Sequence, residues 1–163
     1  MSSGVTVTDE VIENFNAFKM GKAVTFGGEE IPKCRYMTFK MSSDKKFIEM
    51  DSVAPSDKSY DDLQEYCLSL LPAKDGGGKA QARFCLIDLE VSYEKEGTTF
   101  TKSKLVFISW IPDNCPIKEK MLYASSKEAI KRVLIGVPVH VHCTDPDDLD
   151  YDDVILPEFM KFA

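Results

Sequence analysis

Two apolar runs in the second half of the chain constrain its fold more than any other feature. Phe84–Ile87 is apolar at every position, and Leu105–Ile111 is apolar except at Ser109. Short runs without polar alternation are typical of strands that are covered on both faces, in the centre of a sheet. They predict a sheet with helices on both of its sides.

Hydrophobic periodicity and cap residues place the other elements around these strands. Helices are predicted over about 9–20, from Ser59 to Pro72, over 112–134 and over 147–156, and further strands over Arg35–Met41, Phe47–Met50 and Val137–Cys143. Turns are predicted at Gly27–Glu30 and Glu94–Thr99. This order of elements predicts the α/β class, as one domain over 1–163 with a central mixed β-sheet flanked by helices on both faces. Residues 1–6 and 157–163 are expected to be tails, the second because Pro157 should end the last helix.

Composition excludes several classes of function. A net charge of -7 argues against nonspecific nucleic-acid binding, which needs a broad basic surface. No apolar run approaches the roughly 20 residues of a membrane span, and the first residues do not form a secretory signal. The five cysteines form no CxxC pair and fit reduced thiols in a cytosolic protein.

Three local patterns could carry chemistry, and each has a simpler interpretation. Gly76–Lys79 lacks the spacing of a phosphate-binding loop and is interpreted as a flexible connector. A calcium loop starting at Asp148 would need glycine where Asp153 stands and glutamate where Phe159 stands, so the aspartates fit a solvated helix start.

The third pattern is the histidine pair. His140 and His142 share a strand face but have no spaced partner for a metal, and are interpreted as surface residues. We therefore expect no catalytic residue, no metal and no cofactor. A metal-dependent hydrolase built on the histidines and aspartates is kept as a remote alternative.

The predicted helix over 112–134 concentrates positive charge on this acidic chain. Asp113 or Asn114 is expected to cap it, with Pro116 in its first turn. Its cations are Lys118, Lys120, Lys127, Lys131 and Arg132. Spacing alone fits an ordinary solvated face as well as a contact surface for an acidic partner. Met121, between the lysines, favours the contact surface, because methionine is enriched at interfaces.

Three segments resemble the actin-depolymerising factor/cofilin family. Trp110 with Pro112-Asp113 and the run Pro116–Ala129 match the family's actin-binding helix, and the Ser3-Gly4-Val5 start and Lys102-Ser103-Lys104 match as well. The resemblance implies a mixed sheet between helices and a cytoplasmic, cytoskeletal, monomeric protein without enzymatic turnover. Such a protein would bind actin monomers and promote filament severing and depolymerisation.

The resemblance also implies roles for residues. The monomer-binding surface would comprise Ser3, Gly4, Val5, Lys118, Lys120, Met121 and Lys127, and the filament surface would include Lys102 and Lys104. Ser3 would be a regulatory phosphorylation site, and phosphoinositide head groups would bind Lys118, Lys120 and Lys127.

The C-terminal region departs from the family pattern. Residues 156–160 contain no arginine, Pro157 should break the helix there, and six aspartates lie just before it. These features predict weak filament side-binding and a bias toward monomer sequestration. An alternative is a relative that regulates another target of the actin system, such as the branch-nucleating complex.

Overall fold

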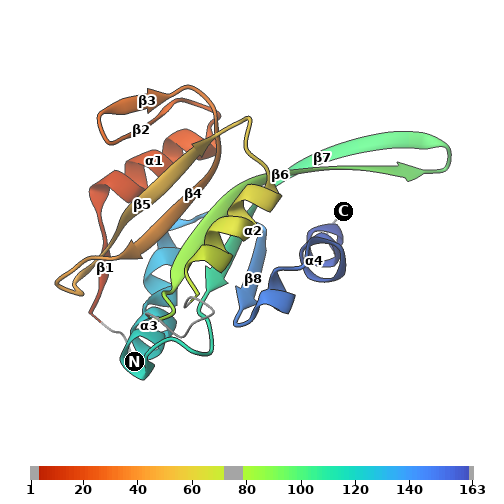
Figure 1. Cartoon of the computed structure of the whole chain (residues 1–163). Helices are drawn as coiled ribbons and strands as arrows, with labels where there is room; N and C mark the ends of the chain where they lie inside the picture. The colour runs from red at the N-terminus through yellow and green to blue at the C-terminus, as the bar shows by residue number, and fades with distance from the viewer. Residues whose placement is uncertain (1–3, 72–78, 162–163) are drawn as a thin grey trace.

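The computed structural model describes residues 4–71 and 79–161, and its centre is a six-stranded sheet (Figure 1). The strands lie in the order β1 (Thr6–Val7), β5 (Phe47–Pro55), β4 (Cys34–Met41), β6 (Arg83–Lys95), β7 (Thr98–Trp110) and β8 (Val139–Cys143). β1 pairs with β5, and β8 with β7, in parallel, whereas the other neighbours are antiparallel. The first apolar run lies in β6 and the second lies in β7 except for Ile111, and both strands have neighbours on both sides, as predicted. β8 starts just after Pro138, at an edge of the sheet.

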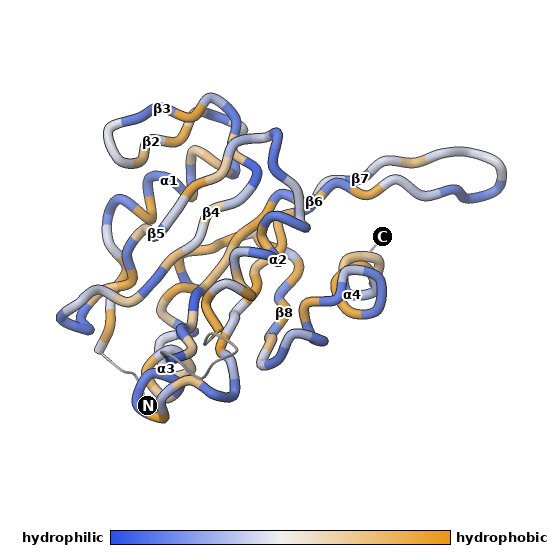
Figure 2. Tube along the Cα trace, in the orientation of Figure 1, coloured by the Kyte–Doolittle hydropathy of each residue, from blue (hydrophilic) through white to orange (hydrophobic). Residues whose placement is uncertain are grey.

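Helices cover both faces of the sheet, which confirms the predicted class. α1 (Asp9–Lys19) and α3 (Ile117–Val133) lie on one face, and α2 (Tyr60–Ser69) and α4 (Leu156–Met160) on the other. Each face has its own hydrophobic cluster, and Figure 2 shows the apolar residues concentrated in the central strands. No helix in the described ranges is long and apolar enough to cross a membrane.

The predicted cap residues start two of these helices. Thr8 Oγ1 accepts a hydrogen bond from the Val11 amide at 3.3 Å at the start of α1. Ser59 and Asp62 form the predicted capping box at the start of α2. Each cap satisfies amides that have no partner inside the helix, so local sequence determined where these helices begin.

The turn predicted at Gly27–Glu30 is confirmed at Gly27–Gly28, but its extent needs correction because Glu29 and Glu30 belong to a strand. β2 (Val24–Phe26) and β3 (Glu29–Ile31) form a hairpin in which Phe26 pairs with Glu29. Gly27 and Gly28 have φ values of 62° and 81°. Positive φ at both positions allows a two-residue hairpin turn, which leaves the glutamates free to pair.

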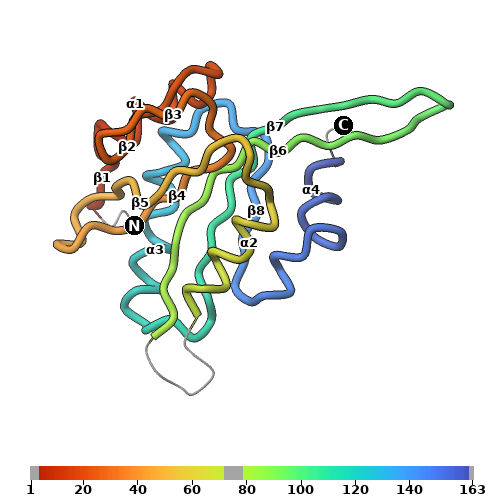
Figure 3. The backbone as a smooth tube through the Cα atoms, turned by 45° about the horizontal axis from the view of Figure 1, so that its top comes forward, coloured from red at the N-terminus to blue at the C-terminus, as the bar shows by residue number. Residues whose placement is uncertain are grey.

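β6 and β7 continue beyond the sheet as a two-stranded ribbon, which Figure 3 shows projecting from the body. Its turn is only Glu96–Gly97, with φ values of 52° and 78°, and is shorter than the predicted Glu94–Thr99. The rings of Tyr93 and Phe100 stack across the ribbon with their centroids 5.6 Å apart. Cross-strand aromatic pairs of this kind stabilise a ribbon that has no helix to cover it.

The predicted N-terminal tail over 1–6 is too long. Val5 is buried in the core, and the Thr6 amide donates a hydrogen bond to the Lys46 carbonyl at 3.2 Å. The edge of β5 supplies backbone partners that the sequence pattern of a two-residue strand cannot indicate. Ser3 and the connector at 76–78 lie outside the described residues.

The predicted stop at Pro157 is wrong, and so is the predicted C-terminal tail for residues 157–161, the part of it that the structure describes. A 3-10 turn (Pro146–Leu149) and a π-helical turn (Tyr151–Ile155) replace the predicted helix over 147–156, and α4 follows them. Pro157 lies in the first turn of α4, where no intrahelical amide donor is required. Phe159 is fully buried against the same face of the sheet that α2 covers. Burial of this ring holds the C-terminal segment on the domain.

Candidate binding surface

The outer face of α3 combines positive charge with exposed apolar side chains. Met121 is 66% exposed and Ile117 is 75% exposed, and Lys118 is exposed beside them. The predicted exposure of Met121 is thus confirmed, whereas the sequence pattern gave no reason to select Ile117. Exposed methionine and isoleucine next to a cation suit a partner that offers both apolar and acidic groups.

The start of α3 differs from the prediction. The helix begins at Ile117 after Pro116, and neither Asp113 nor Asn114 caps it. Instead the chain turns before the helix, where the Cys115 amide donates to the Pro112 carbonyl at 3.0 Å. Because a residue that precedes proline avoids helical backbone angles, Pro116 prevents the helix from starting earlier.

A buried tyrosine fixes α3 on the sheet. Tyr123 is 2% exposed, and its hydroxyl accepts a hydrogen bond from the Met41 amide at 2.9 Å. Its ring centroid lies 5.2 Å from that of Phe84 on β6. Ser125 donates a hydrogen bond to the Leu122 carbonyl at 3.1 Å, a hydroxyl bond back to the preceding turn of the helix. These contacts set which side of α3 faces outward.

A cavity of about 280 Å³ lies beside the first turns of α3. Ile111, Met121 and Ala124 give it apolar walls, and Lys120 and Asp113 also line it. The Lys120 ammonium donates a hydrogen bond to the Asp113 carbonyl at 3.2 Å, which ties the helix to the turn before it. The cavity can receive an apolar side chain from a partner that contacts the outer face of α3.

Farther along α3, the cations gather near the two histidines. His142 Nδ1 lies 3.2 Å from Lys127 Nζ and 2.7 Å from Ser109 Oγ. Burial lowers the pKa of His142, and Lys127 lowers it further. Burial also lowers the pKa of Lys127, with a contribution from Lys131. Repulsion among these groups makes the cluster suitable for an anion.

The histidines do not form the metal site of the remote alternative. His142 Nδ1 is engaged by Lys127 and Ser109, and His140 Nε2 lies 3.0 Å from the Val137 carbonyl oxygen. Over residues 4–71 and 79–161, no three His, Cys, Asp or Glu side chains come together as a metal ion would require. The aspartates before α4 instead form caps, as when Asp145 Oδ1 accepts from the Asp148 amide at 3.2 Å.

The N-terminal strand lies against the same helix. α3 packs on β1, and Val5 directs its side chain into the core between them. Gly4 is exposed at the start of the described chain. The fold thus brings the start of the chain close to α3, as the family pattern implies, although the Val5 side chain is an anchor and not an exposed contact.

Lys102 and Lys104 lie on the ribbon, away from α3, and their environments differ. Lys102 Nζ lies 6.0 Å from the centroid of the Tyr93 ring. Lys104 Nζ donates a hydrogen bond to the Phe159 carbonyl at 2.8 Å and lies 4.7 Å from the centroid of its ring. Lys104 therefore joins β7 to α4, a role that sequence spacing could not reveal.

Comparison with known proteins gives a consistent result. Residues 4–156 match the profile of the family described as "Cofilin/tropomyosin-type actin-binding protein". The chain is 32% identical to actophorin of Acanthamoeba castellanii over 93% of both chains, and 35% identical to cofilin of Saccharomyces cerevisiae over 94% of this chain and 91% of that one. Its fold is similar to the crystal structure of a cofilin attributed to Streptomyces griseoflavus, with a TM-score of 0.73, 29% identity, and coverage of 97% of this chain and 98% of that one.

Proposed function

The chain belongs to the cofilin/tropomyosin-type actin-binding family, and from this premise we propose that it binds actin monomers through α3 and promotes the severing and depolymerisation of filaments. The exposed apolar and cationic face of α3, on a protein of net charge -7, is the observation that carries the proposal. The similarity of the chain to cofilins favours actin over the branch-nucleating complex as its target. The family acts by binding and not by turnover, and we propose the same for this chain, as one homology domain that acts as a monomer in the cytoplasm and at the cytoskeleton.

Substitution of Lys118 and Lys120 by alanine tests the monomer-binding surface. The double variant should bind monomeric actin about 10- to 100-fold more weakly, because interface charges near a binding hot spot contribute about 1–3 kcal/mol. Lys33→Ala, which removes an exposed lysine outside α3, is the matched control and should bind normally. Fluorescence titration of labelled actin measures both affinities. An unchanged affinity for the double variant would mean that another surface binds actin.

We propose that the surface formed by the ribbon and α4 binds actin filaments, but only weakly. α4 is formed despite Pro157, so a broken helix no longer supports weak filament side-binding. Two other features do: Lys104 is engaged with Phe159, and the exposed Asp152 and Asp153 would repel acidic actin. Monomer binding should therefore dominate. Cosedimentation with filaments at physiological salt tests this prediction. If the protein saturated filaments at concentrations as low as those at which it saturates actin monomers, the prediction would be contradicted.

Regulation is proposed for the monomer-binding surface. Phosphorylation of Ser3 would add about -1.5 to -2 charges next to a segment that packs on α3, and would oppose docking on actin. Ser3→Glu should weaken monomer binding, whereas Ser3→Ala should not. We also propose that Lys118, Lys120 and Lys127 bind phosphoinositide head groups. Lys131, which lines a cavity with Lys127 and the two histidines, would add positive charge to this site. Vesicles that contain these lipids should compete with actin, and neutral vesicles should not.

A further inference from the structure

A small cavity lies between the second half of α3 and the edge strand β8. It occupies about 110 Å³, and Lys127 and Lys131 form its α3 wall. His140 and His142 form its β8 wall, and both histidines are exposed. Because they stand two positions apart in a strand, their side chains share one face of the sheet, the face that α3 covers. The four side chains therefore converge from two elements on the same space.

The protein does not balance the positive charge of this cavity. None of the described residues that line it is an aspartate or a glutamate. Lys127 and Lys131 also form no ion pair within residues 4–71 and 79–161. Lys127 Nζ donates to His142 Nδ1 at 3.2 Å, since an ammonium can only donate. A lysine ammonium carries three donors, so Lys127 can also bind an anion in the cavity.

The environment of Lys127 favours an anionic ligand. Burial lowers the pKa of Lys127, Lys131 lowers it further, and Glu128 only partly opposes these effects. A half-buried ammonium beside a second cation is destabilised in its charged form. A bound carboxylate would relieve this cost, whereas a cationic ligand would increase it.

The outer edge of β8 offers backbone groups next to the cavity. β8 is the last strand of the sheet and, among the described strands, pairs only with β7. The Cys143 carbonyl accepts a hydrogen bond at 3.0 Å from the Ile111 amide, which directly follows β7, so the Cys143 carbonyl faces β7. Backbone groups alternate in direction along a strand, so those of His140 and His142 point away from β7. Open strand edges bind extended peptides by adding a strand, and adjacent pockets select their side chains.

We propose that the outer edge of β8 and this cavity together bind an extended segment of a partner protein that carries a glutamate. The segment would add a strand to β8 through hydrogen bonds to the backbone of His140 and His142. Residues side by side on neighbouring strands point to the same face, so a glutamate beside either histidine would lie on the α3 side of the sheet. There its carboxylate would accept hydrogen bonds from Lys127 and Lys131. A lipid head group, by contrast, would use the lysines and leave the strand edge free.

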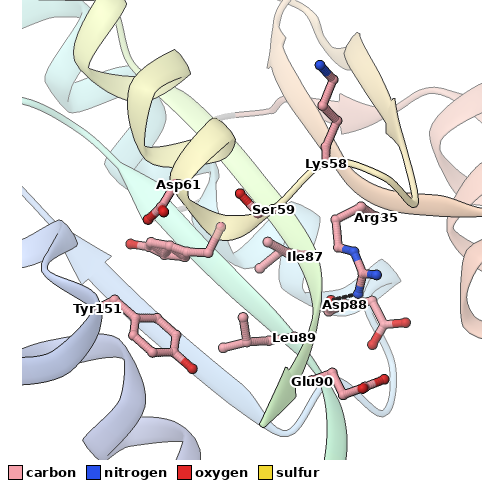
Figure 4. Close-up of a pocket in the computed structure, with 10 residues that line it drawn as sticks. Arg35, Lys58, Ser59, Asp61, Ile87, Asp88, Leu89, Glu90 and Tyr151 are labelled. Carbon is pink, nitrogen blue, oxygen red and sulfur yellow. Dashed lines mark hydrogen bonds between the residues drawn. The ribbon is translucent and has the colours of Figure 1, made fainter.

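The larger cavity at the start of α2 does not suit such a segment. It occupies about 400 Å³, and Figure 4 shows Asp61, Asp88 and Glu90 among the residues that line it. Three carboxylates would repel a glutamate. Lys58 lines the same cavity, and its ammonium points away from Glu90 (Figure 4). Lys58 is therefore a suitable control lysine outside the proposed site.

Nuclear magnetic resonance titration of the 15N-labelled full chain tests this site without actin or lipid, so its outcome is independent of the function proposed above. The probe is the capped peptide acetyl-Thr-Val-Glu-Val-Thr-amide. It should give saturable shifts confined to Lys127–Lys131, Val139–Cys143 and the adjoining residues of β7.

Two control peptides separate the contributions of charge and strand pairing. A peptide with glutamine in place of the glutamate should bind about tenfold more weakly, because it lacks the charge that strengthens hydrogen bonds to ammonium groups. A peptide that keeps the glutamate but is N-methylated at its three central amides should also bind more weakly, by a similar factor, because it cannot donate to the edge of β8.

Variants of the chain give a second readout. Lys131→Gln should weaken the glutamate peptide about tenfold, whereas Lys58→Gln should not change its affinity. The spectrum of each variant reports whether it is folded, and the peptide comparisons need no variant. Equal binding of the glutamate and glutamine peptides, shifts that map to the cavity at the start of α2, or no saturable shifts would each overturn the proposal. Equal binding of the N-methylated peptide would also overturn it, since the cavity would then bind anions without strand pairing, as a head group does.

Discussion

Removing one buried oxygen from α3 should measurably destabilise the protein. In Tyr123→Phe the ring keeps its place against Phe84, but the Met41 amide loses its acceptor at 2.9 Å. Met41 is 6% exposed and Tyr123 is 2% exposed, so water cannot readily replace the hydroxyl. An unsatisfied buried donor costs about 1–3 kcal/mol, and we expect the free energy of unfolding to fall by this amount.

Urea unfolding and thermal unfolding measure this cost. The urea midpoint should fall with an unchanged m value, because the surface exposed on unfolding is the same. Each kcal/mol should lower Tm by about 2–4 °C in a chain of this size. Actin affinity, measured far below the transition, should stay close to that of the unmodified chain, because the hydroxyl lies on the buried side of α3.

Tyr93→Phe is the matched control. Tyr93 stacks on Phe100 in the exposed ribbon, and the described residues offer its hydroxyl no hydrogen bond. Its loss should change stability by less than about 0.5 kcal/mol. Equal urea midpoints for Tyr123→Phe and the unmodified chain would refute the reasoning, since they would mean that the Met41 amide is satisfied in another way.

Further predictions concern three residues that can carry charge. Asp51→Asn should cost about 3–5 kcal/mol in urea unfolding, because Arg83 loses its partner in an ion pair whose side chains are each 11% exposed. Burial raises the pKa of Asp51, but hydrogen bonds from Tyr66 and Thr38 and the charge of Arg83 lower it overall, so the stability that Asp51 contributes should disappear as the pH falls below about 4. Lys104→Met should release α4, seen as faster amide exchange near Phe159 with no change in the central strands. Burial and Lys127 hold the pKa of His142 below its ordinary value; because the unfolded chain is protonated first, stability should decline as the pH falls below about 6.5, and less so in His142→Gln.

Local signals in the sequence were sufficient for most of the fold. Thr8 and Ser59 mark helix starts because a cap depends only on residues a few positions away. The apolar runs in β6 and β7 mark the centre of the sheet because burial on both faces removes the need for polar alternation. These features are determined within a few residues of the chain.

The predictions failed where contacts between residues far apart in the sequence determine the structure. β1 exists because the edge of β5 accepts it, and α4 continues past Pro157 because Phe159 finds a buried site. Likewise, the exposure of Met121 was expected from its neighbours, whereas the link from Lys104 to Phe159 joins residues far apart in sequence. The pairing of β4 with β6 stops at Ile87, although β6 continues to Lys95. No local pattern records these contacts.

The division of the interior into two separate hydrophobic clusters has an evolutionary consequence. Side chains beneath α3 and those beneath α2 do not pack on one another, since the sheet lies between them. Substitutions on the two sides should therefore act nearly independently on stability. Evolution could therefore conserve the side chains beneath α3, where we propose actin binds, while those beneath α2 change, because a substitution on one side would barely alter the effect of a substitution on the other.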